Sequence, residues 1–442
     1  MISLFDWYDQ DTSDLHYSLK AAGYDMPTIV LDETGFLPDD VMSPYSYYAQ
    51  WSKEGKACYF NEVPVDAYEE IAGNNNEASV LVDNQPKAKI YFQSPGSSER
   101  IVKEVLWHRL GEESQWIARD YYNQYGFRYA QVIYAKNNIP AFKHFYHQNG
   151  EIVITENLLV GKTILNENKK IRIFERKIDF IKYFLQEAGL ANESILYNTL
   201  SNSFLVTLEL PRSQREDVLF WHEKLNNVHE VPGNMNFILD GNSATTKIYF
   251  QINEDYQAIK ALNQSRYQMI NYIGTTYPIA RQNHHQKEIL IMTNSDQIES
   301  LKILVENLPN YHFSIAALTE MSSVLMDYQK YDNVHLYPNV APKVIEELFD
   351  KADIYLDINY ANEILNAVRR AFEQNMVIFS FNQTIHQTKY IAKEHIYDAT
   401  DTEKMISAIQ HLDFSQALEK QLQAAGQMES VQFKKIFEGD KE

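Results

Sequence analysis

The sequence predicts an α/β protein with two Rossmann-like domains that face a cleft and an antiparallel β-meander inserted in the first domain. Two patterns predict this fold. Short apolar runs alternate with helical patterns at the start of the chain and again after residue 176, which is typical of parallel sheets covered by helices. Between these blocks, short alternating runs are separated by turn residues, which is typical of an antiparallel sheet. The length of 442 residues suits about three domains.

Residues 1–46 are predicted to form the first part of domain I. An apolar strand at Ile2–Phe5, a helix over Thr12–Tyr24 and a strand at Pro27–Leu31 follow one another. This order of elements opens a βαβ unit.

Residues 47–175 are predicted to form the inserted meander. Asparagine and glycine occur where its strands should reverse, at residues 74–76, 94–96 and 149–150. The expected strands include Ala57–Phe60, Ser79–Val82, Lys87–Phe92, Ile101–Leu106, Gln115–Asp120, Tyr129–Tyr134, Ala141–His147 and Ile152–Thr155.

The alternation of strand and helix resumes for the rest of the chain. We expect residues 176–284 to complete domain I and residues 285–410 to form domain II. The stretch Ser407–Phe437 has a helical pattern, so residues 411–442 are expected to be a helical segment that packs back on domain I.

Composition limits the compartment and the partners. The 40 Lys and Arg residues against 60 Asp and Glu residues give a net charge of −20, which disfavours nucleic acid as a partner. Cys58 is the single cysteine, so no disulfide can form within the chain, as suits a reducing cytosol. The N-terminus lacks a basic region, and no apolar run reaches the roughly 18 residues that a spanning helix needs. We therefore expect a cytoplasmic protein whose membrane association is peripheral.

Glycine is scarce, with 15 residues in the chain and none between Gly274 and Gly426. No pair of glycines has the spacing of a dinucleotide-binding loop or of a P-loop. Because glycine lets the backbone wrap a phosphate, the sequence lacks the usual signature of nucleotide binding.

Two Rossmann-like domains in tandem are the architecture of GT-B glycosyltransferases, whose ligands bind at the carboxyl ends of the strands. Several short motifs add a more specific resemblance. The chain resembles the accessory Sec system glycosylation chaperones in Leu4–Trp7, Asp14–Leu19, Pro27–Leu31, Gly35–Pro38, Ser43–Tyr45, Phe220–Glu223 and Val231–Met235.

These chaperones are the non-catalytic B subunits of the transferase that adds N-acetylglucosamine to serine-rich repeat adhesins. The resemblance implies a pseudo-enzyme that forms a hetero-oligomer with a catalytic A subunit and stabilises it. It also implies that the chain binds the Ser/Thr-rich adhesin before export, at the inner face of the cell membrane. We expect no catalytic residues, no cofactor, no metal and no nucleic acid partner.

The expected donor site lacks the carboxylates of related catalytic enzymes. Retaining GT-B transferases of the related family carry a motif close to E-G-F-G-L-x-x-x-E-A in their second domain. In this chain Asn362 aligns with its first glutamate and Arg370 with its second, while Glu363 is one residue from the first position. An arginine cannot accept hydrogen bonds from ribose hydroxyls, so Asn362, Glu363 and Arg370 are predicted to form a degenerate donor site.

Five residues are candidates for acceptor binding. Trp221, His222 and Glu223 end a predicted strand of domain I, where a cleft residue belongs. Asn234 follows Pro232 and Gly233, and His16 lies on the first predicted helix. Structural roles remain open for all five: Trp221 as a core residue, His222 and Glu223 at a solvated rim, Asn234 as a helix N-cap and His16 in packing.

The sequence also bears on a metal site, on catalysis and on a scaffold role. His144 and His147 are three apart in a predicted strand, so their side chains should face opposite sides and are not expected to share a metal. An active glycosyltransferase would need a carboxylate near the donor diphosphate, for which Glu363 is the candidate. A pure scaffold with a vestigial cleft is the third alternative.

Overall fold

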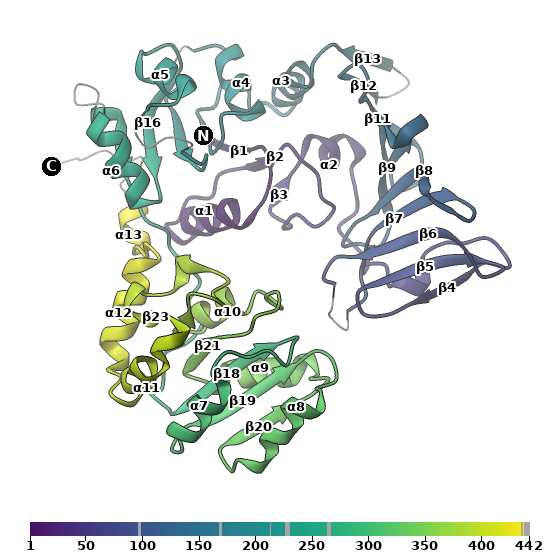
Figure 1. Ribbon diagram of the computed structural model, residues 1–442. Coiled ribbons are helices and arrows are strands. Elements are labelled where there is room, and N and C mark those ends of the chain that lie inside the picture. The colour runs from purple at the N-terminus through teal and green to yellow at the C-terminus, as the bar shows by residue number, and fades with distance from the viewer. Residues whose placement is uncertain are drawn as a thin grey trace. The chain divides into compact units, whose positions relative to one another are not determined.

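The computed structural model describes residues 1–95, 99–167, 170–212, 214–225, 230–262, 267–434 and 436. The chain forms two compact units (Figure 1). The first contains the chain up to Gly274 and again from Ser430, and the second contains Thr275–Glu429. Within the described ranges we find no helix with the length and hydropathy of a membrane span.

The first unit contains a seven-stranded sheet in the order β17-β16-β15-β14-β1-β2-β3, and its paired strands are parallel. Buried apolar side chains fill its strands, as expected where helices cover both faces. The strands are β1 (Ile2–Phe5), β2 (Thr28–Val30), β3 (Val41–Met42), β14 (Ile195–Tyr197), β15 (Asp217–Trp221), β16 (Thr245–Phe250) and β17 (Ile270–Tyr272). The helices are α1 (Gln10–Ala21), α2 (Pro44–Ala49), α3 (Lys177–Glu187), α4 (Asn202–Glu209), α5 (Gly233–Leu239) and α6 (Asn253–Leu262).

The strand order of this sheet reverses at β1. The chain moves from β1 to β2 and β3 on one side, and returns to β14 on the other side. In open parallel sheets, ligands bind where the order reverses, at the carboxyl ends of the strands. This rule directs attention to Asp6 after β1 and Asn198 after β14.

A ten-stranded antiparallel sheet is inserted between α2 and α3, and its strands lie in sequence order from β4 to β13. Two buried clusters support it, one around Ile90 and one around Phe145. The strands are β4 (Glu70–Gly73), β5 (Glu77–Val82), β6 (Gln85–Phe92), β7 (Val102–Arg109), β8 (Glu112–Tyr122), β9 (Arg128–Tyr134), β10 (Pro140–Tyr146), β11 (Ile152–Asn157), β12 (Lys162–Glu167) and β13 (Lys170–Phe174).

One expected strand of the meander is wrong. At Ala57–Phe60 the chain makes a single bridge, between Tyr59 and Ile101, and then a short 3₁₀ helix at Phe60–Glu62. The Glu62 side chain accepts a hydrogen bond from the Tyr59 amide at 2.8 Å, which favours the turn over the strand. The expected turn at residues 94–96 lies partly outside the described residues.

The second unit contains a six-stranded parallel sheet in the order β20-β19-β18-β21-β22-β23. Along β18, Ile289 and Ile291 join the core on one face, whereas Leu290 and Met292 join the core on the other. This alternation buries both faces of the sheet. Its strands are β18 (Glu288–Thr293), β19 (His312–Ala317), β20 (Val334–Tyr337), β21 (Ile354–Asp357), β22 (Val377–Phe381) and β23 (Ile396–Tyr397).

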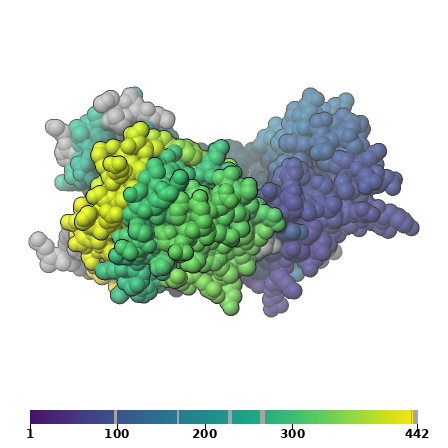
Figure 2. Space-filling view, turned by 60° about the horizontal axis from the view of Figure 1, so that its bottom comes forward, coloured from purple at the N-terminus to yellow at the C-terminus, as the bar shows by residue number. Residues whose placement is uncertain are grey.

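The helices of the second unit are α7 (Leu301–Asn307), α8 (Ser323–Met326), α9 (Pro342–Lys351), α10 (Ala367–Glu373), α11 (Thr402–Gln410) and α12 (Phe414–Ala424). In Figure 2 the yellow residues of the last two helices lie against green residues of the same unit. A hydrogen bond of 2.7 Å from Tyr311 Oη to the Ile409 carbonyl fixes α11 in place.

The C-terminal stretch is helical, as the sequence predicts, and it is divided into separate helices. Asp413 caps a new helix by accepting from the Gln416 amide at 3.0 Å, and Gly426 ends it with a φ of +68°. The return to the first unit begins at Ser430 rather than at residue 411. There α13 (Ser430–Phe433) packs beside α1, with Phe433 fully buried.

Candidate functional site

Asp6 organises the edge of the first unit where β1 and β14 end. Its side chain is buried and accepts hydrogen bonds from the amides of Asn202 at 3.0 Å and Ser203 at 3.1 Å. The hydroxyls of Thr199 and Ser203 lie 2.5 and 2.6 Å from the same carboxylate. Asp6 therefore caps the first turn of α4, which is a structural role at a place where ligands bind in other proteins of this topology.

A chain of polar side chains continues along this edge. Asn198 Nδ2 donates to Thr12 Oγ1 at 2.8 Å and lies 3.2 Å from His222 Nδ1. The other nitrogen of His222 lies 2.8 Å from Gln251 Oε1. The side-chain oxygen of Asn198, Oδ1, is buried and has no hydrogen-bond partner among the described residues. An acceptor with this freedom suits a ligand that donates a hydrogen bond, such as a peptide amide or hydroxyl.

A cavity of about 470 Å³ adjoins the end of β15. Three predicted acceptor residues line it together: Trp221, Glu223 and Asn234. Glu223 Oε1 accepts from the Leu200 amide at 2.8 Å, which holds the carboxylate at the wall. The remaining lining residues are Leu200, Lys224, Glu230, Val231, Pro232 and Gly233.

Trp221 is both a core residue and a wall of this cavity. It is 4% exposed, and its ring stacks on Phe250 with the ring centres 5.8 Å apart. Its indole Nε1 has no hydrogen-bond partner within the described part of the chain. Tryptophan usually pairs this donor when buried, so the free N–H suits a ligand acceptor.

Two other predicted acceptor residues lie elsewhere. His16 lies on α1, where its Nδ1 is 2.9 Å from Tyr8 Oη and its Nε2 is 3.8 Å from Asp40. Burial lowers the pKa of His16. His222 lies between the side-chain amides of Asn198 and Gln251, and it is not among the residues that line the cavity.

The alternative role of Asn234, as an N-cap, is wrong, because Pro232 occupies that position of α5. Asn234 lies instead in the first turn of the helix and is exposed. Its side chain is therefore accessible at the cavity wall.

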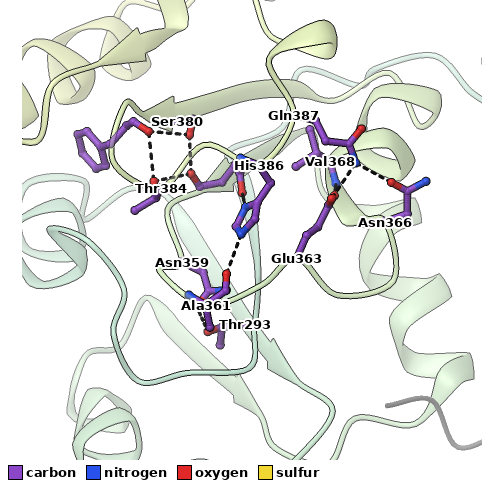
Figure 3. Close-up of polar contacts among 12 residues, drawn as sticks. Thr293, Asn359, Ala361, Glu363, Asn366, Val368, Ser380, Thr384, His386 and Gln387 are labelled. Atoms are coloured by element: carbon purple, nitrogen blue, oxygen red, sulfur yellow. Dashed lines mark hydrogen bonds and ion pairs between the residues drawn. The ribbon is translucent and has the colours of Figure 1, made fainter. Parts of the chain in front are cut away.

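In the second unit, polar groups at the strand ends bond to one another (Figure 3). The amide of His386 donates to Asp357 Oδ2 at 2.8 Å, and its Nδ1 lies 2.5 Å from Asp357 Oδ1. His386 Nε2 lies 2.7 Å from the Ala361 carbonyl. The hydrogen bond to Asp357 raises the pKa of His386 to about 9. At neutral pH a charged imidazole thus ties the end of β21 to the loop that follows it.

The other strand ends are joined in the same way. Thr293 Oγ1, at the end of β18, lies 2.9 Å from Asn359 Oδ1, and both residues are buried. Ser380 and Thr384 donate to the Asp357 carbonyl at 2.6 and 3.0 Å. These bonds occupy polar groups at the switch point between β18 and β21.

Glu363 caps α10. Its carboxylate accepts from the Val368 amide at 2.8 Å and from Gln387 Nε2 at 2.7 Å, and Gln387 also donates to Asn366 at 2.6 Å (Figure 3). A carboxylate used in this way stabilises the start of the helix.

Arg370 lies against α9. Its guanidinium is 4.2 Å from the ring centre of Phe349 and pairs with Glu346. Asn362 is exposed, and Leu365, which falls on the second glycine of the E-G-F-G motif, has a φ of +52°. The backbone keeps a left-handed conformation there but carries a side chain, which a tight phosphate loop excludes.

No group of three or more His, Cys, Asp or Glu side chains in the described ranges is placed to hold a metal ion. Asp6, Asn198, Asp357 and His386 were not singled out from the sequence. Asp6 and Asn198 each follow a buried strand directly and Asp357 ends one, and this position is the signal that finds these three once the strand order is known. No such signal marks His386, which lies five residues after β22.

Two parallel sheets whose strand orders reverse, and whose carboxyl edges collect polar side chains, define a fold of the GT-B glycosyltransferase class. The crystal structure of the pneumococcal O-GlcNAc transferase GtfA with UDP and GlcNAc supports this class, with a TM-score of 0.53 at 14% identity over 96% of this chain and 95% of that one. Four domain families match in order: GtfB N-terminal (2–48), GtfB middle (69–175), GtfB third (177–262) and GftB/GlyA-F C-terminal (289–425).

Whole-chain relatives define the particular family. A UDP-N-acetylglucosamine–peptide N-acetylglucosaminyltransferase stabilizing protein GtfB of Streptococcus pneumoniae serotype 4 is 38% identical over 99% of both chains. That of Streptococcus gordonii is 40% identical over 93% of this chain and 91% of its own. A crystal structure of a GtfA/B complex bound to UDP and GlcNAc contains a chain with TM-score 0.94 and 38% identity, covering 99% of both chains. The chain belongs to the GtfB family of transferase-stabilizing proteins.

Proposed function

We propose that this chain is the non-catalytic subunit of a two-component peptide N-acetylglucosaminyltransferase. In this role it stabilises a catalytic GtfA-like subunit and binds the Ser/Thr-rich acceptor. One observation carries the proposal. At the edge of the second unit where a sugar-nucleotide donor would bind, the side chains of Asp357, His386 and Glu363 make hydrogen bonds within the chain.

The same edge supports the absence of donor binding. At the two positions where the related enzymes have glutamates, Asn362 has no carboxylate and Arg370 has the opposite charge. Restoring a glutamate at residue 370 would place it beside Glu346 and Phe349 of α9, because the helix directs the present side chain there. Both features argue that residues 362 and 370 supply no carboxylate to accept hydrogen bonds from the ribose hydroxyls of a nucleotide.

Calorimetry tests donor binding. We expect UDP-N-acetylglucosamine to give no saturable heat with the isolated chain, and a saturable signal with the chain in complex with its catalytic partner. Micromolar binding by the isolated chain would contradict the proposal and favour an active transferase.

The acceptor-binding part rests on the cavity at the end of β15. Trp221 offers an indole N–H that has no partner among the described residues, and Glu223 keeps acceptor capacity beyond its bond to Leu200. A serine-rich segment carries many hydroxyls and amides, which such groups can pair. Binding several repeats of one acceptor chain in succession raises the effective concentration of unmodified sites.

Fluorescence anisotropy with a labelled serine-rich repeat peptide tests this site. We expect Glu223→Ala and Asn234→Ala each to weaken binding by about three- to tenfold, the loss of one or two hydrogen bonds. Glu216→Ala is the matched control, because Glu216 is exposed and precedes the opposite end of the same strand. If all three variants bind like the wild type, the acceptor lies elsewhere.

The edge of the meander suits contact with the catalytic subunit. Ile171 and Ile173 are 69% and 60% exposed on β13, the last strand of the sheet, and they are two residues apart and so share a face. An exposed apolar edge strand is a surface that proteins normally cover.

Co-purification tests this contact. We expect Ile171→Glu together with Ile173→Glu to abolish recovery of the catalytic subunit, while Val324→Glu, at an apolar position of the second unit that is 57% exposed, leaves it intact. Undiminished recovery of the double variant would exclude this edge.

The acceptor and the location complete the proposal. The resemblance supports a serine-rich repeat adhesin as the acceptor and peripheral association with the inner face of the cell membrane. Flotation of the two-subunit complex with anionic vesicles tests the location. Recovery of all protein in the unbound fraction would contradict it.

A further inference from the structure

The turn between β11 and β12 displays three consecutive aliphatic residues. Leu158, Leu159 and Val160 are 42%, 56% and 59% exposed there. Ile139, in the turn between β9 and β10, is exposed as well. The two turns lie at the same end of the sheet, because β10 and β11 are antiparallel and the Leu158 amide donates to the Ala141 carbonyl at 2.9 Å. We call these four exposed residues the aliphatic tip.

The backbone of the β11–β12 turn is bonded within the chain. The Asn157 carbonyl accepts from the Gly161 amide at 2.9 Å, and Asn157 Oδ1 accepts from the Leu159 amide at 3.2 Å. In hydrocarbon an unpaired amide is costly, so a turn that enters lipid must pair its backbone groups inside the protein. The bonds of Asn157, together with that of the Leu158 amide, meet this requirement for three amides of the turn.

Two aromatic residues lie behind the aliphatic tip. Trp116 and Tyr134 are partly exposed, and their rings meet edge-on with the ring centres 5.4 Å apart. Tyr134 pairs with Pro140 at the base of the turn that carries Ile139. The Trp116 amide donates to Asn138 Oδ1 in that turn at 2.9 Å. Tryptophan and tyrosine favour the boundary between hydrocarbon and water, so this order of side chains matches the layers of a lipid surface.

Charged residues beside the aliphatic tip have both signs, although the chain as a whole carries a charge of −20. Lys162, two residues after Val160, pairs with Glu175 at 2.8 Å. Lys136 is exposed in the turn that carries Ile139. Because a lysine near an anionic membrane is attracted to the lipid headgroups, this end of the sheet suits such a surface better than the net charge suggests.

We propose that the aliphatic tip inserts into the surface of an anionic phospholipid membrane. Leu158, Leu159 and Val160 then leave water for the acyl boundary, with the two aromatic residues at the level of the headgroups. A protruding tip of aliphatic residues lacks the aromatic or arginine anchors on which protein interfaces depend, so lipid is the better occupant. The inference rests on the proposed function, whose membrane association it assigns to this chain and to one end of its meander.

A fluorescent label at the tip measures insertion directly. Cys58 is the single cysteine and is buried, so Leu159→Cys provides one accessible thiol for an environment-sensitive fluorophore. We expect vesicles of phosphatidylglycerol and phosphatidylcholine to shift the emission to the blue, and spin-labelled acyl chains to quench it. Ile152→Cys is the matched control, because Ile152 is exposed at the opposite end of β11 and its label should show neither change.

Flotation of the full chain with the same vesicles measures the contribution of the tip to binding. We expect Leu159→Glu to lower the vesicle partition coefficient about tenfold, the effect of losing one buried leucine. Ile152→Glu should float like the wild type. Both positions are exposed, and circular dichroism checks that the variants are folded.

The outcomes separate this inference from the proposed location. If the two-subunit complex floats, but Leu159→Glu floats equally and the label stays in water, the inference is overturned and the location stands. If no wild-type protein floats, both fail. A blue shift that the catalytic subunit produces and vesicles do not would make the tip a protein contact, which also overturns the inference.

Discussion

His386 bridges Asp357 and Ala361 with its two ring nitrogens, which lie 2.5 Å from the Asp357 carboxylate and 2.7 Å from the Ala361 carbonyl. The bridge joins the end of a central strand to the loop in which related enzymes hold their donor. The two bonds occupy polar groups of this edge with contacts inside the chain. The consequence is measurable, because the bridge depends on the charge of the imidazole.

Replacing His386 with glutamine should change how stability depends on pH. The hydrogen bond to Asp357 raises the pKa of His386 to about 9 in the folded chain, against an ordinary value of 6.5. A group whose pKa is raised by folding stabilises fully below its unfolded pKa and loses that contribution as pH rises through the folded value. We expect His386→Gln to cost about 2 kcal/mol at pH 6 and much less at pH 9.5.

Thermal unfolding from pH 6 to 9.5 measures this effect. His312→Gln, at an exposed histidine of β19, should give a difference from wild type that is small and independent of pH. A constant difference for His386→Gln over this range would show that the charge of the imidazole does not hold the loop.

Asp6→Asn should destabilise the first unit strongly. The carboxylate is buried and receives four hydrogen bonds, and the amide that replaces it turns one acceptor oxygen into a donor facing other donors. We expect a loss of about 2–4 kcal/mol in chemical denaturation. Asp9→Asn, at the exposed N-cap of α1, should cost under about 1 kcal/mol. Equal losses would mean that Asp6 is no more than an ordinary cap.

Gly35→Ala should loosen the junction between the meander and the first sheet. Gly35 has a φ of +79°, and an added Cβ would lie 2.6 Å from the Tyr129 ring and 2.9 Å from the Tyr122 carbonyl. Gly150 has a φ of +88° with nothing within 4 Å of its Cβ, so Gly150→Ala isolates the backbone cost of about 1–2 kcal/mol. We expect Gly35→Ala to exceed this control by about 1–3 kcal/mol. Matching unfolding midpoints for the two variants would contradict the close approach.

His16→Ala should affect stability rather than acceptor binding. The ring packs against Tyr8 and is absent from the cavity that Trp221 and Glu223 line. We expect a loss of about 1 kcal/mol in unfolding free energy and unchanged affinity for the serine-rich peptide. A drop in affinity for the peptide comparable with that of Glu223→Ala would contradict this prediction and indicate that His16 contacts the acceptor.

The sequence predicted elements well where apolar pattern and burial agree. The run Asp217–His222 reads as a strand because its apolar residues are consecutive, and β15 ends within one residue of that prediction. Prediction failed where local polar bonds decide the backbone. One example is the start of α7 at Leu301, where Ser300 adopts a φ of +52° after a turn in which Ser295 Oγ accepts from the Gln297 amide.

In the candidate site too, residues marked by a local sequence pattern could be predicted, and residues that depend on distant contacts could not. Trp221 and Glu223 were predicted as acceptor residues because they lie at the end of a recognisable strand, and Asn234 because of its motif, and the structure places all three at one cavity. The bridge at His386 could not be found, since Asp357 is 29 residues away and no spacing rule links them. That Arg370 leaves the donor site without its second carboxylate stays a prediction. Its ion pair with Glu346 depends on the packing of α9, which the sequence does not specify.

The most direct test of the proposed non-catalytic, stabilising role is a single-turnover transfer assay with labelled UDP-N-acetylglucosamine and a serine-rich acceptor. The catalytic subunit is assayed alone and with this chain, and this chain is assayed alone. We expect no labelled acceptor from this chain alone, and more product and slower thermal inactivation when the catalytic subunit is paired with it. Label transferred by this chain alone, or a catalytic subunit equally stable and active without it, would contradict the account.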